Sequence, residues 1–281
     1  MIQPDDMMAV PCDLCGSEEN DCLFIKEGFP HVRCRRCGLV FVTPRLKAHL
    51  EAQRSSGTGT MGDERLTAAK ERRLQKEVRA LEPHRVLNRL LEVGAGRGWF
   101  LRAAGRSGWE TWAVEVNDQA LEHLAGQSIH RIIVQPAEDF ETPSESFDVV
   151  RMWDVIEHLQ SPRRAVTIAH GVLRRGGLLQ LATTNFASLS RWVNGPDWVY
   201  LNGADHIYLF EPESITRMLR EAGFTDICIR TRSFNLRRKR YHPELELPST
   251  RSILKPFRKI VDALVGFTPY GHQMIVTAVK T

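Results

Sequence analysis

The sequence lacks the features of a membrane or exported protein. No apolar run reaches the roughly 20 residues that a helix needs to span a bilayer. The N-terminal segment MIQPDDMMAV has acidic residues where a signal peptide has basic ones, and no long apolar core follows. A formal net charge of +4 is too small to indicate a nucleic-acid-binding surface. These absences predict a cytoplasmic protein that does not contact a membrane, and 281 residues allow one sizeable domain with a small accessory one.

Cysteines are few and unevenly placed, because five of the six lie in the first 37 residues. Four of them form two C-x-x-C pairs, each followed by a glycine, Gly16 or Gly38, that lets a tight turn close with a left-handed backbone. Disulfides are rare in a cytoplasmic chain, whereas four thiolates in two such turns suit a tetrahedral zinc ion. We therefore predict a structural Zn²⁺ site that leaves out Cys22 and Cys228. Its expected ligands are Cys12, Cys15, Cys34 and Cys37.

Three segments follow one another along the chain. Residues 1–45 predict a zinc-ribbon module, which is too small to fold without its metal. Residues 46–84 combine a glycine- and serine-rich linker at 54–63 with a helix expected over 64–81. Residues 85–281 alternate strand and helix patterns, which predicts an α/β fold with a parallel sheet and crossover helices.

Helix caps and long connections organise the third segment. Asn117 and Ser161 stand where helix N-caps are expected, and the glycines at 176–177 are expected to close the helix that follows Ser161. The connections 185–210 and 233–271 are long enough to build a site beside the carboxyl ends of the strands. The expected strands are 88–93, 110–116, 131–135, 147–153, 178–184, 225–231 and 272–280.

A glycine-rich turn follows the first of these strands, in LLEVGAGRGWFL. A phosphate-binding P-loop needs lysine and serine or threonine after its last glycine, and the chain has Trp99 and a phenylalanine there. A dinucleotide-binding turn needs a third glycine at that same position. What remains is an acid followed by alternating glycines: Glu92, Gly94, Gly96 and Gly98. An acid at this place is unfavourable beside a pyrophosphate and favourable beside the ammonium and sulfonium groups of S-adenosylmethionine.

Later strand ends offer the other groups that such a ligand needs. Glu115, in AVEVN, is placed to accept hydrogen bonds from both ribose hydroxyls. In PAED, the Ala137 amide and the Glu138 side chain are expected at the adenine edge. Trp153 and Asp154, at the end of the fourth strand, are expected to line the methionine end.

The ordered segments LLEVGAGRGWFL, WAVEVND, PAEDF, SFDVVRMWDVIEHL and LRRGGLLQLATTN resemble class I S-adenosylmethionine-dependent methyltransferases, over residues 86–231 and the final strand. The resemblance implies a Rossmann-like sheet of seven strands whose last strand is reversed, with helices on both faces. Cysteine pairs ahead of such a core are similar to bacterial small-molecule methyltransferases of biosynthesis. Pro136 stands where many relatives have an aspartate. The expected S-adenosylmethionine contacts are Glu92, Gly94, Ala95, Gly96, Gly98, Glu115, Val116, Ala137, Glu138, Trp153 and Asp154.

Methyl transfer to a hydroxyl or carbon acceptor needs aligned reactants and a general base. His206, in NGADHIYLFEP, is the first candidate base, with a structural histidine as the alternative. Tyr208 is a candidate for orienting the acceptor, with core packing as the alternative. His158, in DVIEHL, is the third catalytic candidate, although similar enzymes carry a histidine there whatever their acceptor. The aromatic residues Trp192, Trp198 and Tyr200 are expected to wall the acceptor or to cover the core.

Metal-assisted chemistry would need convergent acids near the acceptor. Asp154, Glu157 and Asp205 are available, but nothing in their spacing demands a divalent ion.

Methylation of a small-molecule biosynthetic intermediate, at oxygen with carbon and nitrogen left open, is the leading functional hypothesis. The second hypothesis is an RNA methyltransferase that grips phosphates with the ribbon and with Arg237, Arg238 and Arg240 of the basic segment 230–240. A non-catalytic scaffold is the third. Because the basic segment is short, a small-molecule acceptor is the expected partner.

Overall fold

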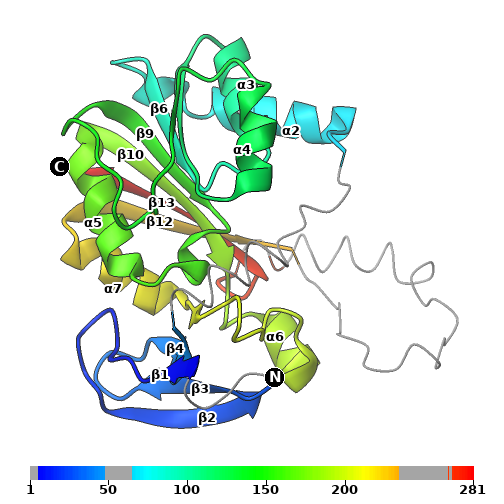
Figure 1. Ribbon diagram of the computed structural model, residues 1–281, viewed down its shortest axis with the longest axis vertical. Helices are drawn as coiled ribbons and strands as arrows, with labels where there is room; N and C mark the ends of the chain where they lie inside the picture. The colour runs from blue at the N-terminus through cyan, green and yellow to red at the C-terminus, as the bar shows by residue number, and fades with distance from the viewer. Residues whose placement is uncertain (1–5, 48–64, 234–264, 266–267) are drawn as a thin grey trace, which may run out of the picture.

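A seven-stranded sheet forms the centre of the molecule in a computed structural model that describes residues 6–47, 65–233, 265 and 268–281 (Figure 1). Its strand order is β12-β13-β10-β9-β6-β7-β8. The strands from β10 to β8 pair in parallel, and only β13 runs antiparallel to both of its neighbours. The predicted Rossmann-like sheet with a reversed last strand is therefore confirmed. The strands are β6 (Arg89–Val93), β7 (Glu110–Val114), β8 (Arg131–Ile133), β9 (Phe147–Trp153), β10 (Leu173–Thr184), β12 (Phe224–Arg232) and β13 (Gln273–Lys280).

Helices cover both faces of this sheet, because its strands carry apolar side chains on alternate sides. The side chain of Leu90 packs in the same apolar cluster as residues of α2, α3 and α4, whereas that of Leu91, the next residue, packs in the cluster that contains residues of α5 and α7. Figure 1 shows α2, α3 and α4 grouped on one side and α5 and α7 on the other. These helices are α2 (Ala68–Arg79), α3 (Trp99–Arg106), α4 (Asp118–Ala125), α5 (Pro162–Val172) and α7 (Pro212–Glu221), with short 3₁₀ turns η2 (Glu82–His84), η3 (Ile156–His158) and η4 (Gly195–Asp197).

Both predicted N-caps are present. The Asn117 side chain accepts a hydrogen bond from the third residue of α4, and the Ser161 hydroxyl does the same for α5. The predicted end of α5 at the glycines 176–177 is wrong. The helix ends at Val172, because the buried residue Leu173 already pairs with β9, and the left-handed Gly176 (φ +71°) lies in a bulge inside β10.

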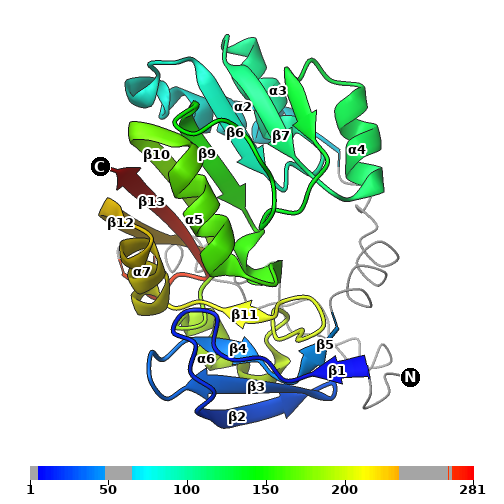
Figure 2. The same ribbon diagram turned by 60° about the vertical axis from the view of Figure 1, so that its left-hand side comes forward.

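The strands of the cysteine-bearing N-terminal part lie in two small sheets, because β1 pairs only with β5. Its strands are β1 (Met7–Met8), β2 (Asn20–Lys26), β3 (Phe29–Cys34), β4 (Val40–Val42) and β5 (Arg45–Leu46). We call the described residues 6–47 the ribbon. The four-stranded sheet has the order β11-β4-β3-β2, and β11 (Tyr208–Leu209) belongs to the insertion 185–210 of the larger part. Figure 2 shows β11 between the ribbon and the helices α5 and α7. The ribbon therefore packs directly against the larger part of the molecule and shares a sheet with it.

The insertion 185–210 also contains α6 (Leu189–Asn194). Two other predicted segments lie mostly or wholly outside the described residues: the linker at 54–63 and the insertion 233–271. Among the residues that the structure does describe, no helix combines the length and apolarity needed to cross a membrane.

Candidate functional site

The glycine turn between β6 and α3 is tight enough to exclude side chains. Gly94, Gly96 and Gly98 all have positive φ angles, of 68°, 53° and 64°, which cost an L-residue roughly 1–2 kcal/mol each. A Cβ on Gly94 would collide with the Val155 side chain, and a Cβ on Gly98 would lie 2.5 Å from a methyl group of Leu124. The sequence therefore needs glycine here both for conformation and for close packing.

Glu115 lies against this turn, at the end of β7. One of its carboxylate oxygens accepts the Gly96 amide at 2.8 Å, and the other accepts the amides of Val116 and Asn117 at 2.9 and 3.0 Å. The predicted cofactor residues of β6 and β7 are thus side by side. We call the glycine turn together with Glu115 the cradle. Val116, the residue after Glu115, is 56% exposed and lies at its edge. Glycine amides, an acid for ribose hydroxyls and an open rim fit an adenosyl ligand.

Glu92 is buried in β6, and its carboxylate pairs with a cation. Its carboxylate is bonded by the guanidinium of Arg151 in β9, which also reaches Glu77 of α2 at 3.1 Å. Burial raises the pKa of Glu92 to about 7, although the Arg151 charge acts in the opposite direction. Sequence reasoning missed Arg151, although an arginine in the otherwise apolar strand FDVVRMW was a signal that a buried partner exists.

On the side predicted for adenine, Ala137 is small and buried, and its contact with adenine stays a prediction. The Glu138 carboxylate accepts the Gln160 amide at 2.7 Å and the Ser161 amide at 3.4 Å. It is therefore turned toward the start of α5, where it satisfies backbone groups.

At the end predicted for methionine, the ring centroid of Trp153 lies 4.1 Å from the guanidinium carbon of Arg151 and 5.2 Å from that of Arg232. Asp154 follows it with a positive φ of 53° and accepts a hydrogen bond from Gln273 of β13 at 2.7 Å. This strained backbone turns the chain into η3, next to the glycine turn.

His158 and His206, from η3 and from the insertion 185–210, meet at the same edge of the sheet. Their ring centroids lie 4.7 Å apart in an edge-on arrangement. His158 Nδ1 is 2.9 Å from the Asp205 carbonyl oxygen and 3.1 Å from its carboxylate. Burial would lower the pKa of His158, but the Asp205 contacts and the Glu157 charge raise the pKa to about 9. Burial and the neighbouring His158 charge lower the pKa of His206 to about 3.

Glu157 completes this group, which we call the histidine cluster (Glu157, His158 and His206). Its side chain is 1% exposed, and neither carboxylate oxygen has a hydrogen-bond partner among the described residues. Burial raises the pKa of Glu157 to about 7 against the charge of His158. One ligand atom from each of the three side chains lies within 4.8 Å of the others. Sequence patterns indicated Glu157 only as an available acid, because the approach of His206, 49 positions later in the chain, has no local signal.

Further buried polar atoms without partners surround the cluster. The ring of Tyr200 lies 5.6 Å from His206 and 4.7 Å from His272, and Trp198 is buried against both Tyr200 and His272. Trp192, by contrast, is 75% exposed. Because folded proteins satisfy most buried polar groups, such a concentration is typical of a place where a ligand binds. The unpartnered atoms here are Trp198 Nε1, His206 Nδ1, His272 Nδ1 and the hydroxyls of Thr183 and Thr184.

Tyr208, the candidate for orienting the acceptor, lies in β11 and faces the ribbon. Its hydroxyl accepts a hydrogen bond from Arg45 at 3.0 Å and donates one to the Gln160 carbonyl at 3.2 Å. Arg45 also bonds the Gln160 carbonyl, at 2.9 Å. Tyr208 is 1% exposed, and burial raises its pKa.

The four predicted metal-binding cysteines are close together in the ribbon. Sγ atoms of Cys12 and Cys37 are 3.4 Å apart, those of Cys15 and Cys34 are 3.5 Å apart, and all four lie within 4.8 Å of one another. Sulfurs on a zinc tetrahedron stand about 3.8 Å apart, given Zn–S bonds of about 2.3 Å. The donor set therefore fits Zn²⁺ in both chemistry and spacing.

The ribbon is also fastened to α5. Between the first two cysteines, Asp13 accepts a hydrogen bond from the Ser161 hydroxyl at 2.7 Å and another from the Arg163 amide at 2.8 Å. Arg33 forms a two-pronged ion pair with Glu211, at the start of α7. Both contacts join the ribbon to helix starts of the larger part.

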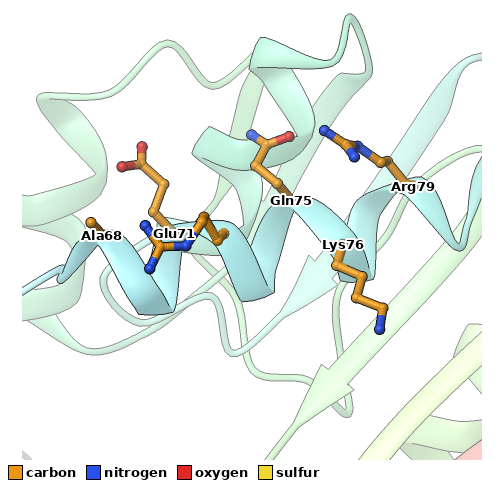
Figure 3. Close-up of a pocket in the computed structure, with 6 residues that line it drawn as sticks. Ala68, Glu71, Gln75, Lys76 and Arg79 are labelled. Atoms are coloured by element: carbon orange, nitrogen blue, oxygen red, sulfur yellow. The ribbon is translucent and has the colours of Figure 1, made fainter.

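A surface hollow lies elsewhere, along the outside of α2 (Figure 3). Its lining comes from one helix alone, including Glu71, which pairs with Arg102 and Arg106 of α3. It contains none of the predicted site residues.

A glycine turn and an acid at the next strand end, on a sheet with one reversed strand, define the class of S-adenosylmethionine-dependent methyltransferases. Residues 66–229 match the family described as a methyltransferase domain. The chain belongs to this family, and the sequence-based prediction of this class is confirmed.

Named relatives agree with this assignment. A probable S-adenosylmethionine-dependent methyltransferase of Mycobacterium tuberculosis (strain CDC 1551 / Oshkosh) is 29% identical over 160 residues, 56% of this chain and 56% of that protein. The ubiquinone biosynthesis O-methyltransferase of Idiomarina loihiensis is 27% identical over 160 residues, 52% of this chain and 65% of that protein. The match thus spans little more than half of the first relative and less than two thirds of the second. A crystal structure of an S-adenosylmethionine-dependent methyltransferase from Archaeoglobus fulgidus shares the fold, with a TM-score of 0.54, 18% identity and coverage of 75% of this chain and 94% of that one.

Proposed function

We propose that the protein transfers the methyl group of S-adenosylmethionine to a hydroxyl oxygen of a small molecule that binds at the histidine cluster. The observation that carries this proposal is the set of buried, unpartnered polar atoms around His206. They lie at the same sheet edge as the glycine turn, since Val155, at the start of η3, packs on Gly94. The O-methyltransferases among the relatives support oxygen as the acceptor atom.

The glycine turn and Glu115 are the groups that would hold the cofactor, which supplies an activated methyl group on a sulfonium. Glu115 would exchange its bonds to backbone amides for bonds to the ribose hydroxyls. Ala95 and Ala137 leave room beside the nucleoside, and Trp153 and Asp154 border its amino-acid end. Glu92 would act on the sulfonium only at a distance, because Arg151 holds its carboxylate.

The acceptor chemistry follows from the protonation states in the cluster. The lowered pKa keeps His206 neutral at physiological pH, so one ring nitrogen carries no proton, but the same shift makes it a weaker base than a free imidazole. His158 is protonated and fixed by Asp205. As the acceptor oxygen bonds to the methyl carbon, the sulfur keeps the electron pair of the broken bond, and the hydroxyl proton passes to His206. In this proposal Tyr208 fixes the ribbon against the core, and a zinc ion on the four cysteines stabilises that ribbon.

The test combines cofactor binding with methyl transfer. We expect the protein to bind S-adenosylhomocysteine in calorimetry and to transfer a labelled methyl group to some members of a panel of hydroxylated metabolites. His206→Asn should lower kcat by about 100-fold or more while leaving cofactor affinity unchanged, and His130→Asn, at an exposed histidine, serves as the control. Absence of any cofactor affinity would refute the proposal.

The RNA hypothesis depends on Arg237, Arg238 and Arg240, which lie outside the described residues. It stays a prediction, which salt-dependent RNA binding by the wild type and its loss on replacing these arginines would support.

A further inference from the structure

The histidine cluster has the composition and spacing of a metal site that is separate from the four cysteines. Glu157, His158 and His206 each offer one ligand atom, and these atoms lie within 4.8 Å of one another. Nitrogen and oxygen ligands bind first-row divalent ions at about 2.0–2.2 Å, so two ligands of one ion lie no more than about 4.4 Å apart. Small side-chain rotations would bring the three groups to that distance.

A buried carboxylate without partners gives independent evidence that something positive belongs here. Glu157 is 1% exposed, and neither of its oxygens has a hydrogen-bond partner of normal geometry among the described residues. Its polar neighbours are the Thr183 hydroxyl and the His158 imidazole, and no lysine or arginine of the described residues forms an ion pair with it. Burying an unpaired carboxylate is expensive. The contrast with Glu92, which has the full guanidinium of Arg151, shows that this chain does compensate buried acids elsewhere.

The histidines are oriented as metal ligands usually are. A ligating imidazole normally donates its second N–H to a carbonyl or carboxylate, which fixes the ring and its tautomer. His158 makes this contact from Nδ1 to Asp205, at 2.9 Å to the carbonyl and 3.1 Å to the carboxylate, and so leaves Nε2 for a ligand. His206 is held by the rings of His158 and Tyr200, and its Nδ1 is buried without a partner.

We infer that Glu157, His158 and His206 bind a first-row divalent transition-metal ion that holds the acceptor hydroxyl. Two imidazole nitrogens and one carboxylate favour Zn²⁺, Fe²⁺, Co²⁺ or Mn²⁺ over Mg²⁺ and Ca²⁺, which prefer oxygen ligands alone. Three protein ligands leave positions open for an acceptor oxygen. The inference rests on the proposed function and changes the role of His206 in it, from proton acceptor to metal ligand. The bound hydroxyl would then lose its proton to water because the cation acidifies it.

The first experiment measures metal binding alone. The full chain, with zinc on its four cysteines, is titrated with Co²⁺ and Mn²⁺, followed by calorimetry and absorption. We expect one further equivalent to bind, with weak visible Co²⁺ bands and without the intense near-ultraviolet bands of cobalt–thiolate bonds. Glu157→Gln and His206→Asn should abolish this binding, and Asp205→Asn should weaken it by about 10–100-fold. His130→Asn is the matched histidine control, and cofactor binding in each variant shows that it is folded.

The results separate this inference from the proposed function. If no second equivalent binds, or if Glu157→Gln binds it as tightly as the wild type, the metal site is refuted while the proposed function still stands on cofactor binding and methyl transfer. If the metal binds but no cofactor does, the proposed function fails and the cation site remains as a binding site only.

Discussion

Replacing Arg151 with methionine tests the electrostatics of the cofactor edge. The change keeps much of the side-chain volume but removes the charge that balances Glu92, whose side chain is 5% exposed. Breaking a buried ion pair by deleting one partner costs about 3–5 kcal/mol. We expect Arg151→Met to lower the free energy of unfolding at pH 8 by this amount in urea titrations. Arg73→Met is the control, because Arg73 forms only a half-exposed ion pair with Glu77, at 3.5 Å, and should cost less than about 1 kcal/mol.

The pH dependence of this cost follows from Glu92 itself. Its pKa in the folded protein is about 7, above the ordinary 4.5 of the unfolded chain, so the folded state binds the proton more readily between these values. The burial penalty is therefore present at high pH and relieved as pH falls below about 7. The deficit of Arg151→Met should be smaller at pH 5 than at pH 8, and adding Glu92→Gln should recover about 1 kcal/mol or more at pH 8. A single variant that loses less than about 1 kcal/mol, or a deficit that grows on acidification, would refute this reasoning.

Three further predictions concern the cradle and the ribbon. Gly94→Ala should weaken S-adenosylhomocysteine binding at least ten-fold in calorimetry, because its Cβ collides with Val155, whereas Gly105→Ala inside α3 has room and should leave affinity unchanged. Burial lowers the pKa of His31 to about 4, so the folded protein holds this imidazole in its neutral form. The free energy of unfolding is therefore highest above pH 6.5 and falls as the pH approaches 4, because the unfolded chain takes up the proton more readily. In thermal or urea unfolding, the free energy of unfolding should be lower at pH 4.5 than at pH 7 by an amount of the order of 3 kcal/mol. This difference should be smaller in His31→Gln, and an equal difference in that variant would contradict the lowered pKa of His31. Removing zinc with a chelator should make residues 6–47 sensitive to protease and abolish methyl transfer while the core still binds S-adenosylhomocysteine; an ordered ribbon after zinc removal would contradict its metal dependence.

Local patterns predicted the sheet well, because each strand and cap is encoded by neighbouring residues. The apolar run of β9 and the caps at Asn117 and Ser161 are examples. Pairing between distant segments has no such signal. The two-residue strand β11 joins the ribbon only because Tyr208 reaches Phe41, 167 positions earlier in the chain. The same limit hid the partner of Glu92, since Arg151 lies on a different strand and the two meet only when β6 and β9 pair.

Glu92 and Glu157 are two buried acids at the same edge of the sheet, and they differ in whether an arginine pairs with them. Glu92 opens the glycine turn and could serve a cationic ligand, yet the fold gives it Arg151, so its charge is already neutralised before any ligand arrives. Glu157 has no arginine or lysine partner among the described residues, and the charge of His158 offsets only part of the cost of its burial. One buried arginine is enough to offset the cost of burying a carboxylate, as Arg151 of β9 does for Glu92. A buried carboxylate without such an arginine can therefore gain binding energy when a cation binds to it. The acid of the glycine turn is therefore held in an ion pair inside the sheet, and we propose the acid of η3 as the one available for chemistry.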